Sequence, residues 1–196
     1  MKALVARSRG AISVEDVDLP RVGPRDVRVA VGAAGVCHSD LSMVDGTLSP
    51  SFPLVLGHEA AGVVAEVGAD ASRVRVGDPV VLNWQPACRA CWFCRSGEPW
   101  LCVQGGAASV PRGGLADGTP LHVTLGLGSL AEQVVVPETA VIAVPASLPT
   151  DVAALLGCAV VTAFGAVRHT AGVAPGQSVD PATFAKKLRD VLDDGR

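Results

Sequence analysis

The sequence has few basic residues, few aromatic residues and no apolar run of membrane-spanning length. Its 16 lysines and arginines are outnumbered by 19 acidic residues, and none of them forms a basic run or stripe. This distribution argues against nucleic acid as a partner. The longest nearly apolar stretch, residues 152–167, is too short to cross a bilayer comfortably, so we also expect no membrane partner.

The sequence also lacks an export signal, internal repeats and low-complexity tracts. The apolar run before Arg7 and Arg9 is too short for a signal peptide, and we therefore expect a cytoplasmic protein. Hydrophobic residues make up 49% of the chain and its mean hydropathy is +0.40, which indicates a compact domain and excludes a disordered chain.

Four of the six cysteines lie close together at Cys-x2-Cys-x2-Cys-x7-Cys spacing. Two short spacers let three sulfurs turn inward from one loop, and Gly97 and Pro99 bend the longer arm toward the fourth. Zinc fits such a set best, and four thiolates leave no position for water, so we predict a structural zinc. Disulfides or incidental core cysteines are the alternative, which the compact spacing and the missing export signal disfavour. The predicted ligands are Cys88, Cys91, Cys94 and Cys102.

Two cysteines remain, Cys37 and Cys158, and His58 lies between them in the sequence. Two sulfurs and one nitrogen leave a fourth position on zinc open for water or a substrate oxygen. Each of these residues taken alone is more simply a buried thiol or a hydrogen-bonded core histidine. Beside the four-cysteine loop, a second and catalytic zinc becomes the favoured interpretation.

The stretch from Gly57 to Ala71 reads Gly-His-Glu-x2-Gly-x5-Gly-x2-Ala. In this motif the chain resembles the zinc-containing alcohol dehydrogenases of the medium-chain dehydrogenase/reductase family, over residues 1 to about 179. The assignment of Cys37, His58 and Cys158 rests on that family's known ligand set. The tryptophan-rich metal loop and the insert at 117–119 look closest to the longer-chain alcohol and formaldehyde dehydrogenase branch.

The resemblance implies a mainly β fold with short helices, in which a GroES-like, partly open β-barrel is followed by C-terminal helices. Valine-rich segments between turn residues predict strands at 2–7, 27–34, 62–67, 79–83 and 132–136. We expect a zinc-binding catalytic domain over 1–150, then an inter-domain helix and the start of a nucleotide-binding domain over 151–179.

Further site residues follow from the resemblance. Ser39, Asp40 and Glu59 match catalytic positions: Ser39 passes on the alcohol proton, Asp40 orients His58, and Glu59 lies behind the metal. The alternative role for Ser39 is to cap a helix that begins near Asp40. The alternative for Asp40 and Glu59 is that each is a solvated carboxylate without a catalytic role. His38 and Thr162 match cofactor-contacting positions, with a structural role as the alternative. Trp84 matches the substrate pocket, and core packing is equally consistent with it. Where the family relay often has a histidine, a few residues after the serine, this sequence has Leu41 and Ser42, so the proton must leave through water or by another route.

The end of the sequence departs from the family. No Gly-x-Gly-x-x-Gly turn follows residues 177–179, so we expect no complete Rossmann domain. Residues 180–196 instead predict one amphipathic helix. Residues 152–167 predict a buried helix. Since no second layer is evident, we expect an exposed apolar surface near Leu155, Val160 and Phe164, covered by the C-terminal helix or by a second copy of the chain.

Two hypotheses of function follow. The first is a zinc-dependent enzyme that uses NAD(P) to oxidise a primary alcohol to an aldehyde, with aromatic alcohols among the candidate substrates. Such an enzyme would carry two zinc ions per chain. Without a complete nucleotide-binding domain this chain would not be self-sufficient, and a separate nucleotide-binding chain would have to supply the cofactor site. A homo-oligomer is the other expected partner. The second is a non-catalytic zinc-binding remnant or interaction module, stabilised by its four-thiolate zinc.

Overall fold

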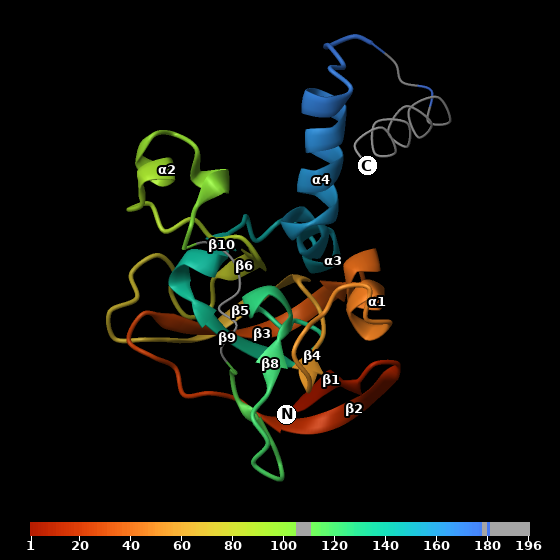
Figure 1. Cartoon of the computed structure of the whole chain (residues 1–196). Helices are drawn as coiled ribbons and strands as arrows, with labels where there is room; N and C mark the ends of the chain where they lie inside the picture. The colour runs from red at the N-terminus through yellow and green to blue at the C-terminus, as the bar shows by residue number, and fades with distance from the viewer. Residues whose placement is uncertain (105–110, 178–179, 181–196) are drawn as a thin grey trace. The chain divides into compact units, whose positions relative to one another are not determined.

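The computed structural model describes residues 1–104, 111–177 and 180 (Figure 1). The chain divides into two compact units, Met1–Cys158 and Ala159–Arg196. Except for Thr162, all of the predicted site residues lie in the first unit, which contains both sheets.

The larger sheet is antiparallel and has the strand order β10-β6-β5-β3-β9. Alternate residues of its central strands point into the core, as the pleat of a strand requires, and Val27, Val29, Val64 and Val80 are almost fully buried. Its strands are β3 (Asp26–Gly35), β5 (Glu59–Val67), β6 (Pro79–Leu82), β9 (Gln133–Pro137) and β10 (Val141–Ala143).

The smaller sheet has the order β7-β2-β1-β4-β8, and only its β4–β8 pair is parallel. Its strands are β1 (Lys2–Ser8), β2 (Ala11–Asp18), β4 (Leu54–Val55), β7 (Gly114–Leu115) and β8 (His122–Val123). Backbone hydrogen bonds from Leu4 to Leu130 and from Glu132 to Lys2 tie β1 to the chain leading into β9. The two sheets thus curl around each other, which confirms the predicted mainly β, partly open barrel (Figure 1).

All five predicted strands are present, although β5 begins at Glu59 and is longer than predicted. Sequence patterns missed β2, β4, β7, β8 and β10. Three of these are only two residues long, too short to show the alternation that identifies a strand. The β2 strand has mostly exposed side chains on both faces, so burial leaves little pattern in its sequence.

The helices are short: α1 (His38–Val44), α2 (Trp92–Arg95), α3 (Thr150–Ala154) and α4 (Ala159–Gly165). Single 3-10 turns lie at η1 (Pro99–Leu101), η2 (Thr124–Gly126), η3 (Glu138–Ala140) and η4 (Leu155–Gly157), and a π-helical turn at η5 (Ala166–Thr170) follows α4. No single helix in the described residues is long and apolar enough to cross a membrane. The segments Thr150–Gly157 and Ala159–Thr170 reach that length only together, as a bent pair.

The prediction of one buried helix over 152–167 is wrong. The helix breaks at Cys158, whose φ of -139° is not helical, and Gly157 lies so close to β6 that a Cβ there would be 2.4 Å from the Leu82 carbonyl oxygen. The expected exposure of apolar residues is confirmed, since Leu155, Val160 and Phe164 are 42%, 44% and 62% exposed. The amphipathic helix predicted for 180–196, and with it the covering of these residues, lies outside the described residues apart from Asp180.

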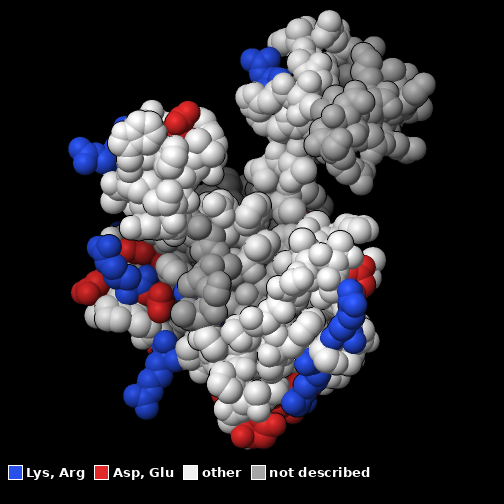
Figure 2. Space-filling model, viewed as in Figure 1, with Lys and Arg blue, Asp and Glu red and all other residues white. Residues whose placement is uncertain are grey.

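Charged residues of both signs are interspersed on the face shown in Figure 2. Surface ion pairs join Lys2 to Asp16 and Arg28 to Glu66, at 2.6 and 3.2 Å. This mixture agrees with the sequence, which has no basic stripe of the kind that binds nucleic acid.

Candidate metal centres

The four cysteines of the 88–102 loop bring their sulfur atoms together around one point. All four Sγ atoms lie within 4.8 Å of one another, and the Cys88–Cys94 and Cys91–Cys102 pairs are each separated by 3.9 Å. A tetrahedral zinc with Zn–S distances of about 2.3 Å would hold its sulfurs about 3.8 Å apart. The loop therefore fits a four-thiolate zinc.

Backbone N–H groups donate hydrogen bonds to these sulfurs and stabilise their thiolate forms. The N–H of Cys91 donates to Cys88 Sγ and the N–H of Cys88 donates to Cys102 Sγ, both at 3.2 Å. The second of these bonds lowers the pKa of Cys102, and the backbone N–H of Cys94 lowers the pKa of Cys91 to about 6. Burial, and then the neighbouring Cys91, raise the pKa of Cys94 to about 12. The Cys94 thiol therefore loses its proton least readily, and a bound cation would favour the thiolate form of all four cysteines.

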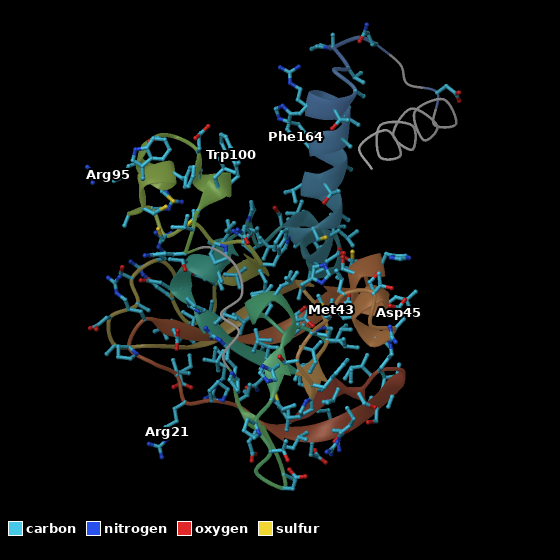
Figure 3. The ribbon with its side chains drawn as sticks, viewed as in Figure 1. Arg21, Met43, Asp45, Arg95, Trp100 and Phe164 are labelled. Atoms are coloured by element: carbon cyan, nitrogen blue, oxygen red, sulfur yellow. The ribbon has the colours of Figure 1, made fainter. Side chains whose placement is uncertain are left out.

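This loop stands out from the sheets in Figure 3, where its sulfur atoms lie beside α2 and the labelled Arg95 and Trp100 point away from them. Trp92 and Trp100 are 70% and 66% exposed, so they are not packed in a core. A segment with so little apolar burial would gain much of its stability from a bound metal.

A second cluster forms from three separate parts of the first unit. Ligand atoms of Cys37, His58, Glu59 and Cys158 all lie within 4.8 Å of one another, and the sulfurs of Cys37 and Cys158 are 4.0 Å apart although 121 residues separate them. Cys37 follows β3, His58 directly precedes β5, Glu59 begins β5, and Cys158 follows η4. Two sulfurs, an imidazole and a carboxylate are a donor set that suits zinc.

Local backbone geometry explains why His58 is held at this point. Gly57 has a φ of +97°, which favours glycine. A Cβ there would lie 2.4 Å from the backbone nitrogen of Leu130. The Gly57 carbonyl also accepts a hydrogen bond from the backbone N–H of Ser129, at 2.9 Å. The chain therefore makes a tight turn directly before a histidine that is only 1% exposed.

Asp40 connects two of the ligands from behind. Its carboxylate is 3% exposed and accepts hydrogen bonds from the backbone N–H groups of Cys37 and Gly57, both at 3.0 Å. Asp40 Oδ1 also lies 3.5 Å from His58 Nδ1, which leaves His58 Nε2 for a metal. Burial opposes the charge of Asp40, but His58 and the two N–H groups together lower its pKa. In return, Asp40 raises the pKa of His58.

Glu59 belongs to the cluster and is 4% exposed. Burial, followed by the charges of Cys37 and Glu59, raises the pKa of the Cys158 thiol to about 12. Burial acts the same way on Cys37, yet hydrogen bonds with Ser39, His58 and Cys158 lower its pKa overall. The neighbouring charges of Cys37 and Glu59 thus disfavour the thiolate form of Cys158, and a divalent cation at this point would offset their repulsion.

The model of the alcohol dehydrogenase GroES-like domain matches residues 23–146, more than half of the chain. This chain belongs to the alcohol dehydrogenase GroES-like domain family. It is 38% identical over 178 residues to an S-(hydroxymethyl)glutathione dehydrogenase of Aspergillus oryzae, covering 86% of this chain and 46% of the relative. A probable S-(hydroxymethyl)glutathione dehydrogenase of Schizosaccharomyces pombe is 39% identical, with 91% and 50% covered.

Solved structures of alcohol dehydrogenases also resemble this chain. An alcohol dehydrogenase zinc-binding domain protein from Burkholderia ambifaria is 35% identical with a TM-score of 0.82, covering 90% of this chain and 50% of that one. Benzyl alcohol dehydrogenase from Acinetobacter calcoaceticus is 28% identical with a TM-score of 0.76 and the same coverage. The chain spans about half the length of the curated relatives it matches.

The other residues expected from the alcohol dehydrogenase resemblance are placed as follows. Ser39 is half-buried, with its hydroxyl 3.7 Å from Cys37 Sγ. Because α1 begins at His38 with Cys37 as its N-cap, the alternative that Ser39 caps this helix is wrong. His38 is exposed and its Nδ1 lies 3.3 Å from the Ser42 hydroxyl. Trp84 is half-buried and packs against the main core, and Thr162 is exposed on α4 in the second unit.

The sequence interpretation missed the part that Cys37 plays in α1. Cys37 and Asp40 stand at the N-cap and N3 positions, where the N3 carboxylate accepts the N-cap N–H. The spacing Cys-x-x-Asp before a helix carried this signal, although cysteine is not among the usual capping residues. The start of α1 thus holds a candidate metal ligand, Cys37, and the neighbouring carboxylate of Asp40 together.

Proposed function

We propose that this chain is the zinc-binding catalytic part of an alcohol dehydrogenase that oxidises a primary alcohol to an aldehyde with NAD(P). The observation that carries the proposal is the cluster in which half-buried Cys37 and Cys158 offer two sulfurs and buried His58 a nitrogen. These three ligands leave a position for an oxygen ligand, with the Glu59 carboxylate lying behind the metal. The four-cysteine loop holds a second, structural zinc, which gives two zinc ions per chain. Membership of the alcohol dehydrogenase domain family supports both assignments.

The chain's own residues prepare this site for an alcohol. A zinc ion bound there supplies Lewis-acid polarisation of a hydroxyl oxygen. Asp40 fixes the imidazole ring of His58, and Ser39 lies next to Cys37, where its hydroxyl can accept a proton from an alcohol and release it. No histidine follows within a few residues of Ser39 in the sequence, so the proton goes on to water.

The remaining assignments concern the two substrates. Trp84 forms one wall of the alcohol pocket and favours an aromatic or extended apolar alcohol, since its ring is half-buried and partly available. The similarity to a benzyl alcohol dehydrogenase agrees with this choice. His38, which is exposed at the start of α1, and Thr162 contact the cofactor.

The test is alcohol-dependent reduction of NAD or NADP by the purified chain, with calorimetric titration of each cofactor into the same sample. Benzyl alcohol and short primary alcohols are the substrates to compare. We expect reduction that is lost in Cys37→Ser and lowered about 100-fold or more in Ser39→Ala, the usual contribution of one proton-transfer group. A chain that binds two zinc ions but neither cofactor, and that reduces neither, is the non-catalytic zinc-binding module instead.

A further inference from the structure

Gly35 is the last residue of β3 and faces Glu59 directly across the sheet, as its antiparallel partner in β5. Both residues border the second metal cluster. Gly35 lies two residues before Cys37, and Glu59 follows His58. The geometry of this one cross-strand pair therefore affects two metal ligands and the carboxylate beside them.

The two strands lie unusually close at this pair. A Cβ placed on Gly35 would lie 3.2 Å from Glu59 Cβ, 3.2 Å from Glu59 Cδ and 2.9 Å from Glu59 Oε2. Directly opposed residues of antiparallel strands ordinarily keep their Cβ atoms about 4.5–5.5 Å apart. Only a residue without a side chain leaves room for Glu59 in its present rotamer. The φ of Gly35 is not in the left-handed region, so this constraint comes from space and not from backbone conformation.

The Glu59 side chain has little other space. It is 4% exposed, and the residues that follow it in β5, Ala60 and Ala61, are 0% and 2% exposed. A methyl group at position 35 would lie 2.9 Å from Glu59 Oε2 and 3.2 Å from its Cβ and Cδ, so the side chain must give by a few tenths of an ångström. The flexible carboxylate end moves most easily, and this movement would take it away from the ligand atoms of Cys37, His58 and Cys158.

We propose that Gly35 is a positioning residue whose missing side chain holds the Glu59 carboxylate within the second metal cluster. This inference rests on the proposed function, because it takes that cluster to be the catalytic zinc site. The consequence is that Gly35→Ala weakens zinc binding at the second cluster although none of the four residues of the cluster is replaced. Loss of a group that supports metal ligands typically costs about 10-fold or more in metal affinity.

The test is a double-mutant cycle of Gly35→Ala and Glu59→Ala in the full chain. The zinc dissociation constant of the second cluster is measured by competition with a chromophoric chelator, and Cys37→Ser gives the baseline for the four-cysteine loop. The visible absorption of cobalt bound at the second cluster is recorded in parallel, since it reports a change in ligands that a merely structural effect would not produce. Gly32→Ala, in the same strand and with its new Cβ 3.0 Å from Thr150 Cγ2, is the matched control.

We expect Gly35→Ala to weaken zinc binding about 10-fold and to alter the cobalt spectrum, while Gly32→Ala does neither. In the Glu59→Ala background, Gly35→Ala should change the affinity by less than about two-fold. Equal losses in both backgrounds, or no loss in either, overturn the inference and leave the proposed function intact. Absence of metal from the second cluster of the wild type overturns both.

Folding of the variants is itself informative. If Gly35→Ala does not fold but Gly35→Ala/Glu59→Ala does, removing the Glu59 side chain has relieved the contact, which supports the inference. If neither variant folds while Gly32→Ala does, position 35 is needed for the backbone alone, and the inference is wrong.

Discussion

Asp40→Ala should destabilise this protein more than any exposed carboxylate. The change removes the acceptor of two buried backbone N–H groups, those of Cys37 and Gly57, and the partner of His58. Each hydrogen bond to a charged acceptor contributes about 1.5–3 kcal/mol, so the pair contributes roughly 3–6 kcal/mol. Alanine also removes the desolvation cost of a carboxylate that is 3% exposed, so we expect a net loss of about 3 kcal/mol in the free energy of unfolding.

The loss should depend on pH in a defined direction. Because the folded protein lowers the pKa of Asp40, its carboxylate stabilises the fold fully above the unfolded value of about 3.9. That contribution disappears as the pH falls through the still lower pKa of the folded state. The difference between wild type and variant should therefore stay constant from pH 7 to about 5 and shrink below about 4.

Urea unfolding followed by tryptophan fluorescence at pH 7 and at about pH 3, below the unfolded pKa of an aspartate, measures both quantities. Asp45→Ala is the control, because Asp45 ends the same helix and is exposed. It should cost less than about 1 kcal/mol. A loss below about 1 kcal/mol for Asp40→Ala, or a loss that grows on acidification, would contradict the role given to Asp40.

Three further predictions concern the rest of the first unit. Glu138 is 5% exposed and accepts two backbone N–H groups of the 72–73 turn, so Glu138→Ala should lower the free energy of unfolding by about 2–3 kcal/mol in urea titrations at neutral pH. The same N–H groups lower the pKa of Glu138, and this contribution should vanish on acidification; an undiminished loss in acid would refute it. A Cβ on Gly62 would lie 2.0 Å from the Ala30 carbonyl oxygen, so Gly62→Ala should lower the thermal midpoint, whereas Gly165→Ala, with open space around it, should not. Zinc removal by a chelator, or Cys102→Ser, should make the 88–102 loop more susceptible to limited proteolysis as it loses its order; unchanged protection would count against a structural zinc there.

Local patterns in the sequence predicted part of this structure well. The four-cysteine loop was predictable because its ligands lie within one short segment, where spacing alone limits the geometry. The valine-rich strands were predictable because alternation reflects burial on one face, as in β3. Membership of the alcohol dehydrogenase domain family was predictable from the motif that begins at Gly57.

Features that depend on distant contacts were not predictable in this way. The break at Cys158 arises from the approach of Gly157 to β6, 75 residues earlier in the chain, and no local residue pattern announces it. The two-residue strands depend on pairing with distant segments: β7 pairs with β2, β4 with β1, and β8 with β4. The closeness of Gly35 to Glu59 follows from strand register, which the sequence alone does not fix.

The most direct test of this account is the zinc content of the purified chain, measured by inductively coupled plasma mass spectrometry. The account predicts two zinc ions per chain, falling to one in Cys37→Ser and to one in Cys102→Ser, because each variant removes a ligand from a different cluster. One zinc ion in the wild type that persists in Cys37→Ser, or no zinc at all, would contradict a metal centre built from Cys37, His58 and Cys158.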